Sequence, residues 1–168
     1  MNSSVPSAPT QAASAKDPVF ASAFDVCQHL LEVTRTAYMN RDADAFAARF
    51  ITPQRIGTFD GDQVITTRQD VLAIFDEICG YLDRERVIDM NRRTIEAEFV
   101  APDVVQATFV SQYVLPGYVL SNEVLTHSTQ KLQDGIWRVA DSYYATNIPA
   151  LTRALTSAAE RKRNKSLA

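Results

Sequence analysis

Apolar residues recur every three or four positions in the first part of the chain. Between residues 17 and 38 they cover so broad an arc that the predicted helix must pack on two sides. Asp17-Pro18 is expected to start this helix, since an acidic N-cap followed by proline is a common helix start. The segment Asn40-Arg41-Asp42 is expected to end it. Asp42 then caps a short second helix, which we expect Pro53 to end.

A short hairpin and a third helix are predicted next. Strands over residues 55–59 and 63–66 flank the turn residues Asp60-Gly61. The segment Thr67-Arg-Gln-Asp70 is a variant of the capping box, with Asp in its last position, and opens the third helix. The buried stripe of this helix is predicted to comprise Val71, Leu72, Ile74, Phe75, Ile78, Cys79 and Leu82.

From Arg86 onwards the pattern of apolar residues changes to a period of two, which is typical of strands. Four long strands are predicted over residues 86–100, 104–115, 118–133 and 136–145. Tight turns separate them, the last at Asp134-Gly135. Long strands joined in this way favour a strongly bent antiparallel meander.

The two ends of the chain differ from this central domain, which we place at residues 17–147. Residues 1–16 are rich in Ser, Ala, Pro and Thr, and are expected to form a disordered leader. Residues 148–168 are expected to form a C-terminal helix with a basic tail, whose positive charge complements the helix dipole.

Composition narrows the class of protein. The formal net charge is -3, so the overall excess of basic residues that nucleic-acid binding favours is missing. No apolar run approaches the roughly 18 residues of a membrane span. Cys27 and Cys79 lie in apolar, helix-like segments and form no Cys-x-x-Cys pair, which favours free thiols in a reducing cytoplasm. Phosphate-binding, serine-hydrolase and zinc-protease motifs are missing, so we expect no cofactor and no metal.

Three segments carry a resemblance to a known superfamily: residues 37–50, 67–75 and 134–139, the last reading Asp-Gly-Ile-Trp-Arg-Val. In this order they resemble the nuclear transport factor two-like superfamily, which includes SnoaL-like polyketide cyclases, ketosteroid isomerase and scytalone dehydratase. The resemblance covers about residues 20–145. It implies an α+β, cone-shaped roll, in which a strongly bent, mainly antiparallel sheet wraps around the long N-terminal helix and leaves a mostly apolar pocket. It also implies a homodimer formed through the outer face of the sheet.

The resemblance does not extend to the residues of ketosteroid isomerase. The position of its tyrosine falls on Thr34, with Tyr38 one turn further along the same face. Its base position falls near Thr58 and its second acid near Ser128, beside His127. None of these positions carries the required residue, which argues against steroid isomerisation.

The last predicted strand offers a different acid or base. Trp137, Asp141 and Tyr143 share one face by the period of two, so all three line the pocket if Trp137 points inward. A carboxyl group in an apolar cavity has a raised pKa, which makes Asp141 a candidate acid or base. The alternative is that Asp141 pairs with an arginine at the rim. His127, Tyr143 and Tyr38 are its candidate partners, although the pattern does not tell which face of the strand carrying His127 is inward.

Ligand-binding candidates are aromatic or hydroxyl-bearing residues: Tyr113, Trp137, Phe59, Phe75 and Thr34. Arg92 and Arg93, followed by Glu96 and Glu98, are predicted to form a cross-strand charge ladder on an exposed or dimer face.

The sequence thus favours a cytoplasmic protein that binds a small apolar or aromatic molecule, with isomerisation, cyclisation or dehydration as its candidate reactions. The main alternative is a non-catalytic protein-binding or dimerisation module of the nuclear transport factor type. A third is an accessory subunit like the small subunit of ring-hydroxylating dioxygenases, which share this fold.

Overall fold

The computed structural model describes residues 15–146, 160 and 163–164. The helices are α1 (Ala23–Asn40), α2 (Ala43–Ala47) and α3 (Arg68–Arg84). The strands are β1 (Phe50–Thr58), β2 (Gly61–Ile65), β3 (Asp89–Ala101), β4 (Val104–Leu115), β5 (Val119–Leu120), β6 (Val124–Gln133) and β7 (Ile136–Tyr144). This order of helices, hairpin, helix and long strands confirms the predicted α+β class.

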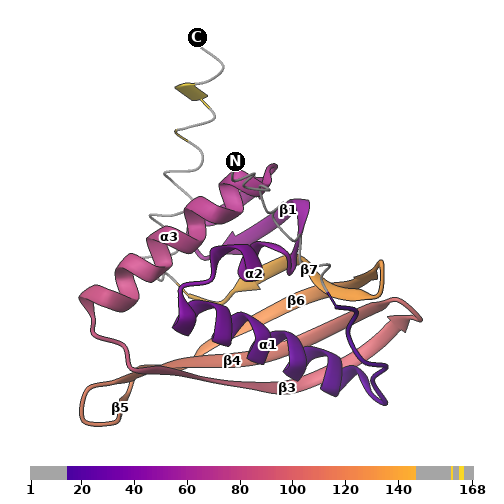
Figure 1. Cartoon of the computed structure of the whole chain (residues 1–168), viewed down its shortest axis with the longest axis horizontal. Coiled ribbons are helices and arrows are strands. Elements are labelled where there is room, and N and C mark those ends of the chain that lie inside the picture. The colour runs from indigo at the N-terminus through magenta and orange to yellow at the C-terminus, as the bar shows by residue number, and fades with distance from the viewer. Residues whose placement is uncertain (1–14, 147–159, 161–162, 165–168) are drawn as a thin grey trace, which may run out of the picture.

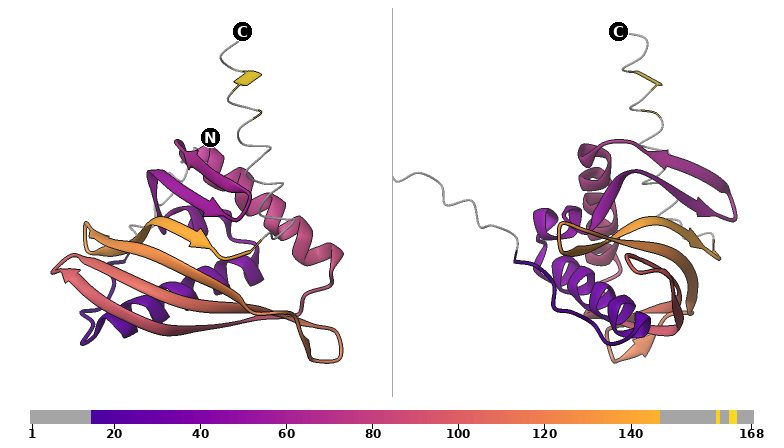
Figure 2. Two further views of the ribbon diagram at one scale, coloured as in Figure 1. Left: turned by 180° about the vertical axis from the view of Figure 1, so that it is seen from behind. Right: turned by 90° about the vertical axis from the view of Figure 1, so that its right-hand side faces the viewer.

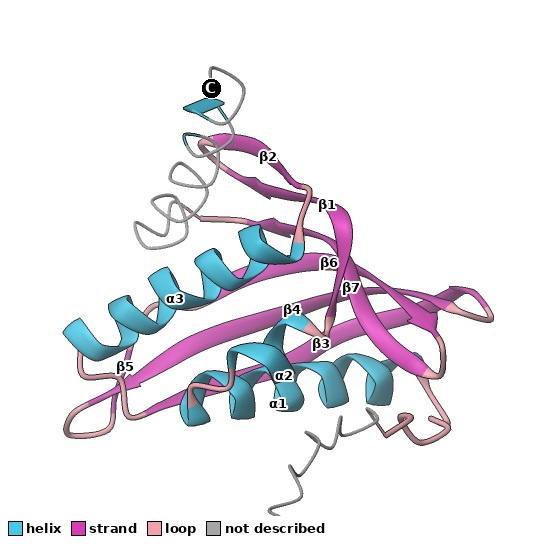
Figure 3. Ribbon diagram, turned by 45° about the horizontal axis from the view of Figure 1, so that its top comes forward, coloured by secondary structure: helices cyan, strands magenta, loops and turns pink. Residues whose placement is uncertain are grey.

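The strands form one curved sheet in the order β2-β1-β7-β6-β4-β3, with the short β5 paired to β4. Strands β3, β4, β6 and β7 form the predicted antiparallel meander, while β1 pairs with β7 in parallel. The sheet curls around the helices (Figures 1 and 2), and α1 and α3 cover the same concave face (Figure 3). The sheet is therefore mixed and open, with β2 and β3 at its edges.

Helix α1 begins later than the sequence predicted. Its N-cap is Ser22, whose hydroxyl accepts a hydrogen bond from the backbone N–H of Asp25 at 3.1 Å. The predicted start at Asp17-Pro18 is therefore wrong. The carboxylate of Asp17 instead accepts the backbone N–H of Trp137 on β7 at 2.8 Å, and its own N–H donates to the Gly135 carbonyl at 2.9 Å, so Asp17 is held at the start of β7.

The junction between α1 and β1 agrees with the prediction in part. Arg41 closes α1 in the left-handed conformation, with φ of 57°, and Asp42 caps α2 as predicted. Helix α2, however, ends at Ala47, and Pro53 lies within β1 after a cis peptide bond. The pairing of β1 with β7 shifts register between residues 50 and 55, and proline is tolerated at such an irregularity because it has no N–H for the ladder.

The capping box of α3 is present as predicted. The Thr67 hydroxyl accepts the backbone N–H of Asp70 at 3.1 Å, and the Asp70 carboxylate accepts the backbone N–H of Thr67 at 3.1 Å. Apart from Leu72, which is half-buried, the predicted stripe of this helix is buried.

Several predicted strands have different limits, and two of them differ most. The predicted strand 118–133 is divided into β5 and β6, because Ser121 binds back to β4: its hydroxyl accepts the N–H of Tyr113 at 2.8 Å and its own N–H donates to the Tyr113 carbonyl at 2.9 Å. Strand β3 begins at Asp89 rather than at Arg86, whose φ of 53° belongs to a turn.

Two clusters of apolar side chains form the core. One gathers residues of α2, α3, β1 and β2 around Phe46, Phe75 and Leu82. The other joins α1 to β4 and β7 around Val26, Leu30 and Trp137. The space between these clusters, on the concave side of the sheet, is where the cavity described below lies.

The predicted leader lies outside the described residues except for positions 15 and 16. Only positions 160, 163 and 164 of the predicted C-terminal helix and tail are described. Within the described part of the chain, no helix is both long enough and apolar enough to cross a membrane.

Candidate functional site

A cavity of about 110 Å³ lies between α1, α3 and the concave face of the sheet. A single water needs about 10–15 Å³ on this scale, and an apolar cavity of roughly 150 Å³ can hold a benzene-sized molecule. The space therefore suits a molecule of about one ring. Its apolar lining comprises Leu30, Leu31, Phe46, Phe50, Ile56, Val71, Ile74, Ile78, Met90, Phe109, Val124 and Val139.

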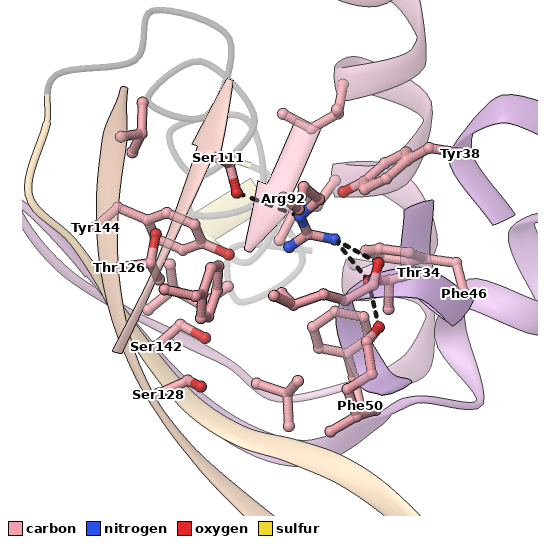
Figure 4. A pocket seen from close by; sticks show the side chains of 18 of the residues that line it. Thr34, Tyr38, Phe46, Phe50, Arg92, Ser111, Thr126, Ser128, Ser142 and Tyr144 are labelled. Atoms are coloured by element: carbon pink, nitrogen blue, oxygen red, sulfur yellow. Dashed lines mark hydrogen bonds between the residues drawn. The ribbon is translucent and has the colours of Figure 1, made fainter. Parts of the chain in front are cut away.

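The polar groups of the cavity are mostly neutral. Three tyrosines, five hydroxyl side chains and two amides reach it from the helix α1 and from four strands. Figure 4 labels several of these side chains. They are Tyr38, Tyr113, Tyr144, Thr34, Ser111, Thr126, Ser128, Ser142, Gln54 and Gln130. The one formally charged residue among the described lining residues is Arg92.

Arg92 on β3 is half-buried and points into the cavity (Figure 4). Its Nη1 donates to the Thr34 hydroxyl at 2.7 Å and to the Leu31 carbonyl at 3.3 Å, and its Nε donates to the Ser111 hydroxyl at 3.2 Å. Its guanidinium carbon lies 5.5 Å from the centre of the Phe109 ring. All three hydrogen-bond partners are neutral.

The predicted charge ladder is therefore wrong for Arg92. Successive strand residues point to opposite faces, so Arg92 shares the inner face with Met90 while Arg93 points outward and pairs with Glu123 at 3.0 Å. The predicted ladder placed Arg92 and Arg93 on one face of the sheet. Neighbouring residues of a strand point to opposite faces, so the sequence already excluded this arrangement.

No carboxylate lines the cavity. All 20 Asp and Glu residues of the chain are among those that the structure describes, and none is in the lining. The same holds for both histidines. The described residues also contain no group of three or more His, Cys, Asp or Glu side chains placed to hold a metal ion.

The hydroxyl groups of the three cavity tyrosines have raised pKa values. Burial raises the pKa of Tyr113 to about 12, and burial also raises the pKa of Tyr144 and, more strongly, that of Tyr38. The positive charge of Arg92 works against these shifts but does not cancel them. At neutral pH the three hydroxyls are therefore protonated and able to donate hydrogen bonds.

Three buried oxygen atoms of the lining lack a hydrogen-bond partner among the described residues: Gln54 Oε1, Thr126 Oγ1 and Gln130 Oε1. Buried polar atoms are usually paired, because leaving one unpaired costs about 1–3 kcal/mol. The cavity thus offers polar atoms that a bound molecule or water can satisfy.

An irregularity in β7 decides which of its residues face the cavity. Thr129 of β6 pairs with Asp141, but the next residue, Gln130, pairs with Val139, so Ala140 is an extra residue on β7. The Asp141 carboxylate accepts the backbone N–H of Thr129 at 3.2 Å beside this bulge. Before this bulge the odd-numbered residues Trp137 and Val139 point to the inner face of the sheet. After it the even-numbered residues point inward.

The prediction that Asp141 and Tyr143 line the cavity is therefore wrong. Ser142 and Tyr144 take those places. Asp141 and Tyr143 lie on the outer, convex face, where Asp141 is the register partner of Arg55.

His127 also lies on the outer face and is exposed. Its Nδ1 is 3.2 Å from the Thr108 hydroxyl, which in turn donates to Glu96 at 3.2 Å. His127 is the register partner of Tyr143. The sheet thus brings the predicted residues Asp141, His127 and Tyr143 near one another, but away from the cavity.

The remaining predicted residues divide into two groups. Thr34, Tyr38 and Tyr113 line the cavity. Phe75, Trp137 and Phe59 are outside the described lining. Phe75 is buried behind it and stacks on Tyr38 at 5.2 Å, and Trp137 is buried against α1. Phe59 follows β1, is 63% exposed and does not line the cavity.

Comparison with known proteins finds similarity in structure alone. No family model matches the chain, and a search of curated proteins finds no match. A domain of unknown function with a cystatin-like fold from Nostoc punctiforme superposes with a TM-score of 0.59 at 15% identity, covering 89% of this chain and 96% of that one.

Two further solved structures agree. An NTF-2 like protein of unknown function from Shewanella oneidensis gives a TM-score of 0.59 at 13% identity, over 73% of this chain and 98% of that one. A ketosteroid isomerase-like protein from Erwinia carotovora atroseptica gives 0.52 at 13% identity, over 75% and 97%. At these identities the likeness establishes the fold, which is the cone fold expected from the sequence.

Proposed function

We propose that this chain, which has the cone fold of the NTF2-like proteins, binds a small, mostly apolar molecule in the cavity between α1, α3 and the sheet. The observation that carries the proposal is the lining, whose surface is mostly apolar and into which polar groups converge from several elements. That combination is typical of sites for small molecules. The solved structures of this fold support the architecture.

Binding fits the lining better than acid-base catalysis does. Isomerisation, cyclisation or dehydration without a cofactor needs a group that takes up a proton near neutral pH. The lining contains no carboxylate and no histidine, and the raised pKa values of Tyr38, Tyr113 and Tyr144 make these tyrosines poor bases. Any catalysis at this site would have to use tyrosine hydroxyls and Arg92 as hydrogen-bond donors.

Ligand-detected NMR with benzyl alcohol, benzamide and benzoate tests the proposal, because each probe is of single-ring size. Ser128→Leu adds bulk inside the cavity and is expected to abolish binding. His127→Leu, the neighbouring position on the outer face of the same strand, is expected to leave binding unchanged. Failure of all three probes to bind the wild-type protein, or equal loss in both variants, would contradict the proposal.

Dimerisation through the outer face of the sheet is a second candidate function. Leu125 and Tyr143 are 46% and 45% exposed on this face, next to the buried Val110. Exposed apolar residues grouped in this way favour an interface. Light scattering on the full chain is expected to give the mass of a dimer, and Leu125→Glu is expected to give that of a monomer. A monomeric wild-type protein at high concentration would exclude this interface.

We further propose that the protein is cytoplasmic. Cys27 and Cys79 are both free and buried, which suits a reducing compartment. Fractionation of the source cells tests this, and recovery outside the cytoplasm would contradict it.

A further inference from the structure

Arg92 is the feature of the cavity that its apolar lining does not explain. A guanidinium that is partly withdrawn from water loses hydration, and proteins usually restore this loss with a carboxylate partner. Arg92 has no such partner: no salt bridge to it is found, although every Asp and Glu of the chain is among the described residues. Its positive charge therefore faces the cavity uncompensated.

Among the described residues, the hydrogen bonds of Arg92 leave part of its guanidinium without a partner. Nη1 and Nε make the three bonds to neutral oxygen atoms, and Nη2 takes part in none of them. In Figure 4 the guanidinium lies between the side chains of Tyr38 and Tyr144, whose hydroxyls point toward it. These hydroxyls are protonated donors, so the region around Arg92 presents several donors and one positive charge.

A carboxylate matches this arrangement. Its two oxygen atoms accept hydrogen bonds from the planar fork of an arginine, and such charge-assisted bonds are stronger than bonds between neutral groups. The Phe109 ring beneath the guanidinium and the apolar side chains beyond it would contact the rest of the molecule.

We propose that the ligand of the cavity is a small carboxylic acid of about one ring in size, whose carboxylate pairs with Arg92 and whose apolar body fills the remaining space. This inference rests on the proposed function, since it specifies the molecule that the same cavity binds. It assigns Arg92 as the residue that selects a negatively charged ligand over a neutral one.

A purely structural role for Arg92 makes a different prediction. Its bonds to Leu31 and Thr34 join α1 to the sheet, so loss of the side chain would lower stability in either case. A structural role, however, gives no preference for the charge of a ligand. Charge selectivity is therefore the measurement that separates the two roles.

The experiment compares benzoate with benzamide, which have nearly the same shape and differ in charge. Calorimetric or NMR titrations at pH 7 would be made with the wild-type protein, Arg92→Gln, Arg92→Lys and Arg93→Gln. The wild type is expected to bind benzoate roughly 10- to 100-fold more tightly than benzamide, the range that hydrogen bonds to charged groups give. Arg92→Gln is expected to lose this preference while still binding benzamide.

The other two variants act as controls. Arg92→Lys keeps the charge without the fork and is expected to retain part of the preference, which protects the test if Arg92→Gln folds poorly. Arg93→Gln removes the adjacent, outward-facing arginine and is expected to keep the full preference. Equal binding of benzoate and benzamide by the wild type would overturn this inference and leave the proposed function standing. Binding of neither probe would overturn this inference, and failure of benzyl alcohol to bind as well would overturn the proposed function too.

Discussion

The carboxylate of Asp17 accepts a hydrogen bond from the backbone N–H of Trp137 at 2.8 Å, across 120 positions of the chain. The same carboxylate also accepts Arg49 Nη1 at 2.7 and 2.8 Å and lies 3.0 Å from His29 Nε2. Its side chain is only 4% exposed. Asp17 thus links the segment before α1 to three elements: to α1 through His29, to the residue before β1 through Arg49, and to β7 through Trp137.

Replacing Asp17 with Asn is expected to lower the free energy of unfolding by about 3 kcal/mol, because it leaves Arg49, whose side chain is largely covered, without its charged partner. Urea unfolding at pH 7 measures this. Asp44→Asn is the control, since Asp44 also pairs with an arginine, Arg68, but its side chain is 86% exposed. That substitution is expected to cost less than about 1 kcal/mol. Equal losses in the two variants would show that burial of the Asp17 pair is irrelevant.

The contribution of Asp17 is also expected to depend on pH. Burial alone would raise the pKa of Asp17, but the hydrogen bonds from Arg49, Trp137 and His29 outweigh it and hold the pKa below its ordinary value of 3.8. A lowered pKa means that the stabilisation is complete above pH 3.8 and is lost as the pH falls through the lower value of the folded protein. The stability difference between wild type and Asp17→Asn should therefore shrink in acid. A stability difference between the two proteins that stays constant as the pH falls would contradict this expectation.

Four tyrosines are expected to titrate at a higher pH than usual. Burial raises the pKa of Tyr38, Tyr81, Tyr113 and Tyr144, with Tyr113 reaching about 12. A raised pKa contributes stability that is complete below the unfolded value of about 10 and is lost as the pH rises through the folded value. The phenolate absorbance of the folded protein at pH 11 should therefore fall well short of that of the six tyrosines in the denatured chain. The full signal at pH 11 without unfolding would contradict the burial of the cavity hydroxyls.

Gly57 is expected to tolerate no side chain. A Cβ at this position would lie 2.5 Å from Cδ2 of Tyr143 and 2.7 Å from Oδ1 of Asp62. Gly57→Ala should therefore cost about 1–3 kcal/mol in urea unfolding. Gly80→Ala in α3 is the opposite control: its Cβ would meet only the flexible end of Arg84, at 3.3 Å, and alanine favours a helix interior by roughly 1 kcal/mol. The same sign for both substitutions would contradict this account.

Structural features that are determined by residues close together in the sequence could be predicted from the sequence. The capping box at Thr67 and Asp70, the N-cap at Asp42 and the turn at Asp134-Gly135 are each specified within a few residues, and all are present. The order of the elements was enough to predict the α+β class, and the resemblance of three segments to the NTF2-like superfamily implied the cone. These features need no knowledge of what lies across the sheet.

The cavity residues depend on contacts that are distant in the sequence. The single extra residue Ala140 reverses the facing of β7, and the period of two offers no sign of it. Asp17 resembles a helix cap locally, but its partners Arg49 and Trp137 lie far along the chain. Arg92 is the missed cavity residue that the sequence could most easily have indicated. It lies two positions after Met90 on β3, so the period of two places both side chains on the same face.

The same substitution at two positions of the cavity is expected to have opposite effects. The Thr34 hydroxyl donates to the Leu30 carbonyl at 2.7 Å and accepts from Arg92 at 2.7 Å, so Thr34→Val should cost about 1–2 kcal/mol by removing both bonds. The Thr126 hydroxyl is buried without a partner among the described residues, so Thr126→Val should stabilise the protein by about 1 kcal/mol. Urea unfolding of both variants measures the difference. Destabilisation by Thr126→Val would instead show that this hydroxyl has a partner, such as a water molecule in the cavity, and that the polar side of the cavity is hydrated when no ligand is bound.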